Sequence, residues 1–155
     1  MPLAEREACG FEIVVAYTLG QAIQLMDRGT INVRDAVILI DNLTNDVRGT
    51  RIRPSVTPGE LVRRLNQLRA VLMRAGAKQT IICQIKPMRF KDVAPYNEKL
   101  SDYLRGQRQG IGHPTQVRHG HLSPDGFHVR PEYHWVIDKT YAGAMRIARP
   151  PQDSH

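Results

Sequence analysis

The chain has 155 residues and a mass of 17.5 kDa, with 41% hydrophobic and 24% charged residues, which fits one soluble globular domain and excludes wholesale disorder. Its net charge of +7 favours phosphates or acidic surfaces as partners. Two cysteines, Cys9 and Cys83, are too few for a disulfide framework. Because no signal peptide or membrane-length apolar run is visible, the sequence predicts a cytoplasmic or intracellular protein.

The first half of the chain alternates patterns typical of strands and helices. Residues 12–17 are β-branched and almost continuously apolar, which predicts a strand covered on both faces. Apolar residues at helical spacing predict a helix over 19–29, and 35–40 predicts a second buried strand followed by a polar loop at 41–46. A capped start and a leucine stripe predict a helix over 58–76.

The second half continues the alternation. Residues 79–85 predict a strand, and 95–106 predict a helix that ends at a glycine. The glycine-rich, basic segment 107–114 is typical of a surface loop, and 115–119 favours a short last strand. A final helix is predicted to open at Pro131.

This order of elements predicts an α/β fold with a mainly parallel sheet and helices on both faces. The predicted organisation is a short N-terminal extension (1–10), one domain (11–148) and an exposed tail (149–155).

Polar side chains follow the strand predicted at 35–40. In open α/β sheets ligands bind at the carboxyl ends of strands, so Asn45 and Asp46 are candidates to reach a site. A turn rich in Asn and Asp that merely leaves the strand is the alternative interpretation.

A second polar loop, Leu122 to His128, sets Asp125 and His128 three positions apart. An imidazole that is oriented by a carboxylate can act as a general base near neutral pH. The alternative is an Asp-Gly turn in which His128 only packs beside Phe127.

Arginines are concentrated between residues 48 and 74, a segment that contains seven arginines and a single acidic residue, Glu60. This pattern predicts an anion or nucleic-acid patch, although no aromatic platform, zinc-finger or RRM pattern accompanies it. A solvated basic face is the alternative. The residues assigned to the candidate patch are Arg48, Arg51, Arg53, Arg63 and Arg64.

Three histidines, His119, His121 and His128, are candidate metal ligands, because a His-x-His pair on a strand can present two ligands on one side. No cysteine lies near them. The sequence therefore predicts neither a metal site nor a cofactor.

The polar loops together resemble motifs of the SGNH, or GDSL-type, hydrolase family. The resemblance rests on Thr44-Asn45-Asp46 after a buried strand and on the Asp-x-x-His loop before the last helix, and it covers roughly 13–145. It implies a flavodoxin-like three-layer sandwich and ester hydrolysis by Ser-His-Asp chemistry. In that scheme Asp125 orients the base His128, and the Asn45 amide donates to the oxyanion.

The chain departs from the family pattern at three places. Leu43 stands where the third motif has glycine, and Gly20 is the nearest candidate for the glycine of the second motif. The Gly-Asp-Ser loop that carries the nucleophile has no counterpart, because every serine stands in another context: Ser55, Ser101, Ser123 and Ser154.

Residues 12–17 correspond to the family's second strand, so the resemblance implies that the first strand is missing. In the family's strand order, 2-1-3-4-5, this loss leaves a gap inside the sheet. Either the neighbouring strands close up or an outside segment fills the space, and an exposed edge would favour self-association.

Two functions follow as hypotheses. The chain is an SGNH-like hydrolase domain for a small ester or acylated substrate, inactive or incomplete without a nucleophile. The alternative is a noncatalytic basic module that binds nucleic acid or an acidic partner. The resemblance also suggests a retroelement association, because such esterase-like domains occur in retroelement proteins.

Overall fold

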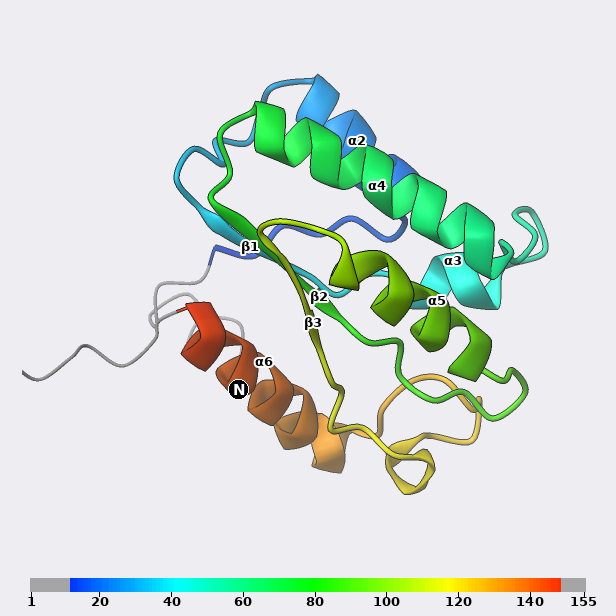
Figure 1. The fold of residues 1–155 in the computed structure, drawn as a ribbon. Coiled ribbons are helices and arrows are strands. Elements are labelled where there is room, and N and C mark those ends of the chain that lie inside the picture. The colour runs from blue at the N-terminus through cyan, green and yellow to red at the C-terminus, as the bar shows by residue number, and fades with distance from the viewer. Residues whose placement is uncertain (1–11, 149–155) are drawn as a thin grey trace, which may run out of the picture.

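The computed structural model describes residues 12–148, which form an α/β fold consistent with a flavodoxin-like sandwich (Figure 1). The sheet has three parallel strands in the order β1 (Val37–Ile40), β2 (Gln79–Cys83) and β3 (Gly110–His113). The α/β class and the parallel sheet are thus confirmed. The expected extension at 1–10 and the tail at 149–155 lie outside the described residues.

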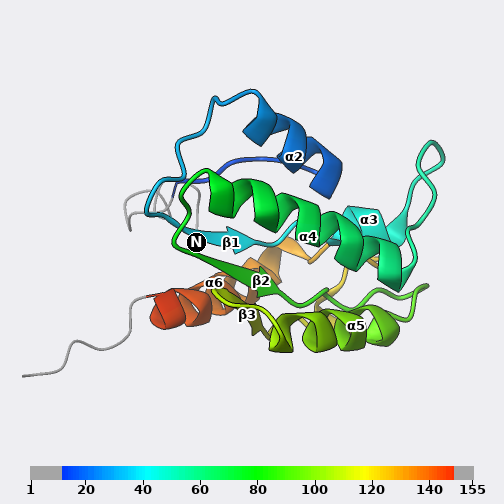
Figure 2. The ribbon, with the colours of Figure 1, turned by 45° about the horizontal axis from the view of Figure 1, so that its top comes forward.

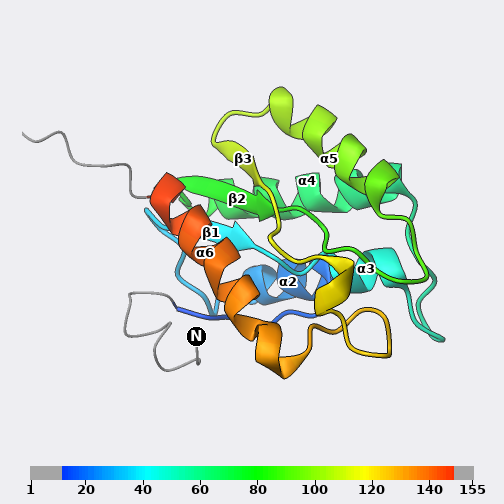
Figure 3. The ribbon, with the colours of Figure 1, turned by 90° about the horizontal axis from the view of Figure 1, so that it is seen from below.

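Helices cover both faces of the sheet, giving three layers (Figures 1 and 2). One outer layer contains α2, α4 and α5, with α4 packed on both α2 and α5. The other contains α6, which lies in front of the sheet in Figure 3, the view from below. The helix bounds are α2 Leu19–Asp27, α3 Thr44–Arg48, α4 Pro58–Arg74, α5 Ala94–Arg105 and α6 His134–Ala148, with 3-10 turns η1 His119–His121 and η2 Pro131–Tyr133. No helix within these residues is long and apolar enough to span a bilayer.

Helix α4 forms where its local signals predict it. The Thr57 hydroxyl accepts a hydrogen bond from the Glu60 amide, and Pro58 occupies the first turn. Gly76 has a φ of +97°, which suits glycine just after a helix end. Its leucine stripe is buried against the sheet and α2, through Leu61, Leu65, Leu68 and Leu72.

The core lies between the sheet and the layer of α2, α4 and α5, where Ile40 and Ile82 meet the leucine stripe. A second, smaller cluster joins the loop after β3 to α6 through Val117, Leu122, Val129 and Val136. The polar loop that contains Asp125 is therefore anchored by this second hydrophobic cluster.

The strand predicted at residues 12–17 is wrong. These residues make no sheet ladder, and their apolar side chains are largely exposed, with Val15 at 65%. Their composition suits a strand, but within residues 12–148 β1 pairs only with β2. The link to β1 is a side chain, because Asn42 Nδ2 donates to the carbonyls of Ala16 and Thr18 at 3.0 and 3.3 Å.

The last strand was also misplaced. Strand β3 lies inside the segment predicted as a surface loop (107–114), whereas the predicted strand at 115–119 is not one. Packing favours glycine at position 110, because a Cβ there would lie 2.5 Å from Arg69 Nη2. Arg69 is buried, and its guanidinium donates to groups around this strand: Thr80, Tyr103, Gln107 and the Arg108 carbonyl.

The polar loop predicted at 41–46 is partly helical. Helix α3 begins at Thr44, so Asn45 and Asp46 lie on a short helix directly after β1. Two neighbouring residues of a helix point in different directions, which separates the roles of Asn45 and Asp46.

Candidate active site

Asp125 and His128 contact each other in the structure. The His128 Nδ1 atom lies 2.5 Å from Asp125 Oδ2. Asp125 Oδ1 accepts three further hydrogen bonds of 2.9 Å, from the amides of Phe127 and His128 and from the Ser123 hydroxyl. The carboxylate is thus both the centre of the turn and the partner of the imidazole.

The ionised Asp125 carboxylate determines which ring nitrogen of His128 carries the proton. The hydrogen bond from the Phe127 amide, with those from His128 and Ser123, holds the pKa of Asp125 well below its usual range. Because the carboxylate is ionised and only accepts, Nδ1 carries the proton that joins the two side chains. The neutral ring therefore keeps Nε2 as its basic nitrogen.

The loop is held in place from two sides. Leu122 and Val129 are buried and form an antiparallel bridge at its base. At its tip the Arg89 amide donates to the Gly126 carbonyl at 2.8 Å, and Arg89 Nη1 donates to the Pro124 carbonyl at 3.0 Å. Gly126 has a φ of +82°, and a Cβ there would lie 2.7 Å from Arg89 Cβ. Both constraints explain the glycine.

Asn45 lies on the part of α3 that reaches this loop. The next helical turn places Arg48 over the Phe127 ring, with 4.0 Å between the guanidinium carbon and the ring centroid. The Phe127 ring in turn contacts the His128 ring, with 3.9 Å between centroids. Asn45 Nδ2 donates to the Tyr17 carbonyl at 3.0 Å, and its second N–H has no acceptor in residues 12–148. That N–H therefore remains free to donate within the described part of the chain.

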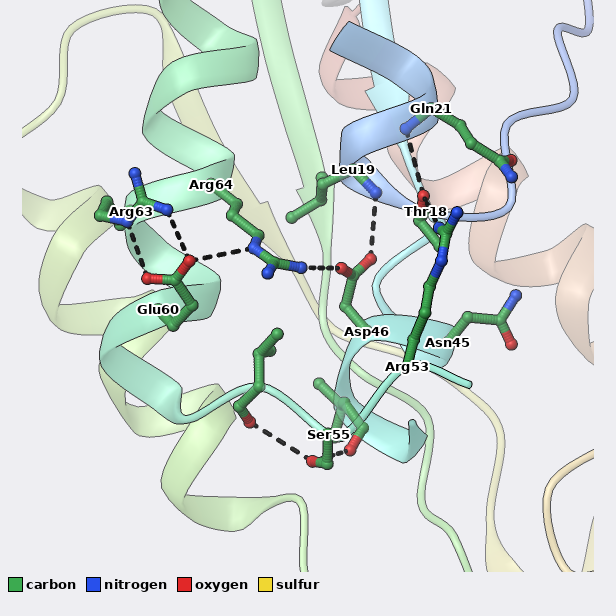
Figure 4. Close-up of polar contacts among 12 residues, drawn as sticks. Thr18, Leu19, Gln21, Asn45, Asp46, Arg53, Ser55, Glu60, Arg63 and Arg64 are labelled. Atoms are coloured by element: carbon green, nitrogen blue, oxygen red, sulfur yellow. Dashed lines mark hydrogen bonds and ion pairs between the residues drawn. The ribbon is translucent and has the colours of Figure 1, made fainter. Parts of the chain in front are cut away.

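Asp46 does not reach the site, although its sequence position suggested that it would. Its carboxylate is buried, with Oδ2 accepting from the Leu19 amide at 3.0 Å and Oδ1 from Arg64 Nη1 at 3.1 Å (Figure 4). It therefore satisfies an amide at the start of α2 and joins α2 to α4.

The arginines of the predicted patch divide into two sets. Arg63 and Arg64 both pair with Glu60, and Arg64 also pairs with Asp46 (Figure 4). Three others are exposed and have no carboxylate within ion-pair distance among the described residues: Arg48, Arg51 and Arg53.

No serine is poised as a nucleophile in the described part of the chain. Ser55, Ser101 and Ser123 lie within it, and none is hydrogen-bonded to the His128 ring. The Ser123 hydroxyl donates to Asp125 and to the His128 carbonyl instead. Ser154 lies outside the described residues.

The histidines do not converge on a metal. Between residues 12 and 148 there is no cluster of three His, Cys, Asp or Glu side chains that could bind one. His121 Nδ1 accepts a hydrogen bond from the Arg118 amide, and His128 Nδ1 is engaged by Asp125.

An open groove of about 1050 Å³ is lined mainly by residues 87–94 and by α5. Its wall includes Phe90, which is 83% exposed, and the Phe90 ring lies 3.2 Å from the position of a Cβ at Gly126. The groove is therefore adjacent to the Asp125 loop. Other side chains that line it are Gln84, Met88, Asn97, Ser101 and His119.

Sequence reasoning brought Asp125, His128 and Asn45 forward but missed the stack of Arg48 on Phe127. The three-residue spacing of Asp125 and His128 is a local signal, which a turn can satisfy alone. The contact joins residues that are 79 positions apart, and nothing in the sequence distinguishes Arg48 from the six other arginines between residues 48 and 74. No family model matches this chain, and no curated protein or solved structure matches it either.

Proposed function

We propose that this chain carries the acid–base half of an SGNH-type ester hydrolase site. The single observation that carries the proposal is the 2.5 Å contact between His128 Nδ1 and Asp125, whose lowered pKa leaves Nε2 as the base. The resemblance of the sequence motifs supports the same roles.

In the proposed reaction, a nucleophilic hydroxyl oxygen bonds to the ester carbonyl carbon while His128 Nε2 takes its proton. Asp125 stabilises the imidazolium that results. The free amide N–H of Asn45 donates to the carbonyl oxygen as it becomes negative. The tetrahedral intermediate then expels the alcohol, which receives the proton from His128, and water releases the acyl group by the same two steps.

The nucleophile must come from outside the described residues, and the sheet offers a place for it. In the described part of the chain, the edge of β1 that faces residues 12–17 has no paired strand, and Asn42 Oδ1 at its carboxyl end is buried without a hydrogen-bond donor. An extended segment on this edge would satisfy both. Its carboxyl end would emerge beside Asn42, close to α3.

The test supplies the missing group. A strand that ends in Gly-Asp-Ser is joined ahead of residue 12 by a flexible linker, and hydrolysis of p-nitrophenyl acetate is compared with the original chain and with a Gly-Asp-Ala version. We expect turnover only with serine. Equal rates for the serine and alanine versions, in a folded protein, would refute the proposal.

The exposed set Arg48, Arg51 and Arg53 favours the second candidate, a noncatalytic module that binds nucleic acid. Its affinity for a labelled oligonucleotide should fall steeply with salt, because phosphate contacts release counterions. A flat salt response, or no binding at low salt, would remove this candidate.

A further inference from the structure

We infer that Arg48 and Arg53 form an anion-binding subsite beside His128, so that the ester taken by this site also carries a phosphate or carboxylate group. Only the identification of the ligand as an ester rests on the proposed function. The subsite itself rests on the position of two arginines that have no acidic partner in residues 12–148.

Arg48 is placed by its contact with the loop. Its guanidinium covers the Phe127 ring, which itself touches the His128 ring at an interplanar angle of 40°, so Phe127 connects Arg48 to His128. Stacking uses the face of a guanidinium and leaves its N–H edge free. No described residue accepts a hydrogen bond from that edge, since no hydrogen bond or ion pair of the Arg48 side chain is formed within 12–148.

Arg53 lies near Asn45, the residue three positions before Arg48 on α3. In Figure 4 its side chain passes Asn45 and ends at Thr18, where Nη1 lies 3.5 Å from the hydroxyl oxygen. That contact is weak because of its length, and the same oxygen also accepts a shorter hydrogen bond of 3.1 Å from the Gln21 amide. The turn below holds the residue in place, with the Thr50 amide donating to the Arg53 carbonyl at 2.6 Å.

The nearby acids are already engaged. Asp46 is bound by Arg64 and the Leu19 amide, and Asp125 by His128 and the turn amides. Among residues 12–148, Arg48 beside the Phe127 ring and Arg53 beside Asn45 are therefore left without an acidic partner. Guanidinium N–H pairs match phosphate and carboxylate oxygens, so these are the groups that the subsite should select.

Anion binding can be measured without any hydrolysis. Inorganic phosphate and acetate are titrated separately into the chain at fixed ionic strength, and the NMR shifts of the His128 ring and the Arg48 Nε–H group are followed. The variants are Arg48→Gln and Arg53→Gln. Arg63→Gln is the matched control, because Glu60 already neutralises that exposed arginine.

We expect saturable shifts at His128 and Arg48 with at least one of the two anions, and the tighter anion identifies the charged group of the ester. Each of Arg48→Gln and Arg53→Gln should weaken binding about fivefold, whereas Arg63→Gln should leave it nearly unchanged. The absence of saturable shifts would overturn the subsite. So would equal weakening by all three variants, or oligonucleotide binding that depends equally on Arg63 and Arg48, which would indicate a general basic face.

The two proposals fail separately. Saturable binding in a chain that stays inactive after the Gly-Asp-Ser segment is added would retain the anion subsite and remove the hydrolase. Hydrolysis of p-nitrophenyl acetate without anion binding would do the reverse.

Discussion

At the scale of single residues, Asp125 has two roles that the sequence presents as alternatives: it forms the Asp-Gly turn and it binds the His128 ring. One oxygen accepts the turn amides and the other accepts the imidazole, so the Asp-Gly turn and the oriented histidine exist together. The turn amides also keep the carboxyl ionised, because they lower its pKa. A common turn thereby becomes an orienting group for His128.

Asp125→Asn should disturb the tautomer of His128 without unfolding the chain. The lost negative charge removes the partner that holds the proton on Nδ1, so we expect the ring ¹⁵N shifts to report a mixture of tautomers at a pH where the ring is neutral. Ser123→Ala is the control, because it removes one bond to Asp125 but leaves the imidazole contact. An unchanged Nδ1–H tautomer in Asp125→Asn would show that Asp125 does not set it.

Cys83 should be chemically inert in the folded chain. The thiol is buried at the end of β2, and burial, with a contribution from the Asp41 carboxylate, raises its pKa far above the usual value. In a Cys9→Ser background we expect no reaction with a thiol-specific disulfide reagent at pH 8 until denaturant is added. Rapid reaction under native conditions would contradict the burial of this strand end.

At the scale of elements, Arg64 joins three helices through two different acids. It pairs with the exposed Glu60 on its own helix and with the buried Asp46 on α3, which also binds the first amide of α2. Exposed ion pairs contribute little to stability. Removing a buried acid is costly, because it leaves the arginine without its partner.

Asp46→Ala should therefore lower the free energy of unfolding by about 2–4 kcal/mol, as measured by urea denaturation at pH 7. Glu60→Gln is the matched control on the same arginine and should have a much smaller effect. The Arg63 and Arg64 contacts lower the pKa of Glu60 to about 2 from 4.5, so its small contribution is present at neutral pH and is lost as the pH falls through that window. Equal losses for the two variants would contradict the structural role of Asp46.

The elements that could be predicted from the sequence are those with local causes. Helix α4 has its cap, proline and leucine stripe within one segment, and its prediction is confirmed. Strand β3 has two glycines and one isoleucine in Gly110–His113, and its course is set by contacts with Arg69 and β2, which no local pattern contains. Residues 12–17 show the converse, because their composition favours a strand but their backbone pairs with no other strand among the described residues.

At the scale of the whole molecule, β1 is an edge strand of the three-stranded sheet that the described residues form. Strand β1 is entirely apolar, and none of the charges or prolines that protect edge strands lies within it. Beside it stand the exposed side chains of Ile13, Val14 and Val15, and the orphaned Asn42 oxygen lies at its end. These features indicate an edge that accepts another strand.

Hydrogen exchange should reveal this edge. In a parallel strand alternate amides point to opposite sides, so half of the β1 amides should exchange quickly while those of the central strand β2 stay protected. Joining the Gly-Asp-Ser strand should slow the fast set. If all β1 amides in the original chain were as protected as those of β2, the edge would already be covered, whether by this chain or by a second copy.

The most direct test of the acid–base pair is covalent labelling of the added serine by a fluorophosphonate, because the reagent reports an activated hydroxyl whatever the substrate. We expect the chain joined to the Gly-Asp-Ser strand to be labelled at that serine, and His128→Gln to slow labelling at least about a hundredfold. Labelling at the same rate with and without His128, in proteins of equal stability, would contradict the assignment of Asp125 and His128 as the acid–base half of a hydrolase site.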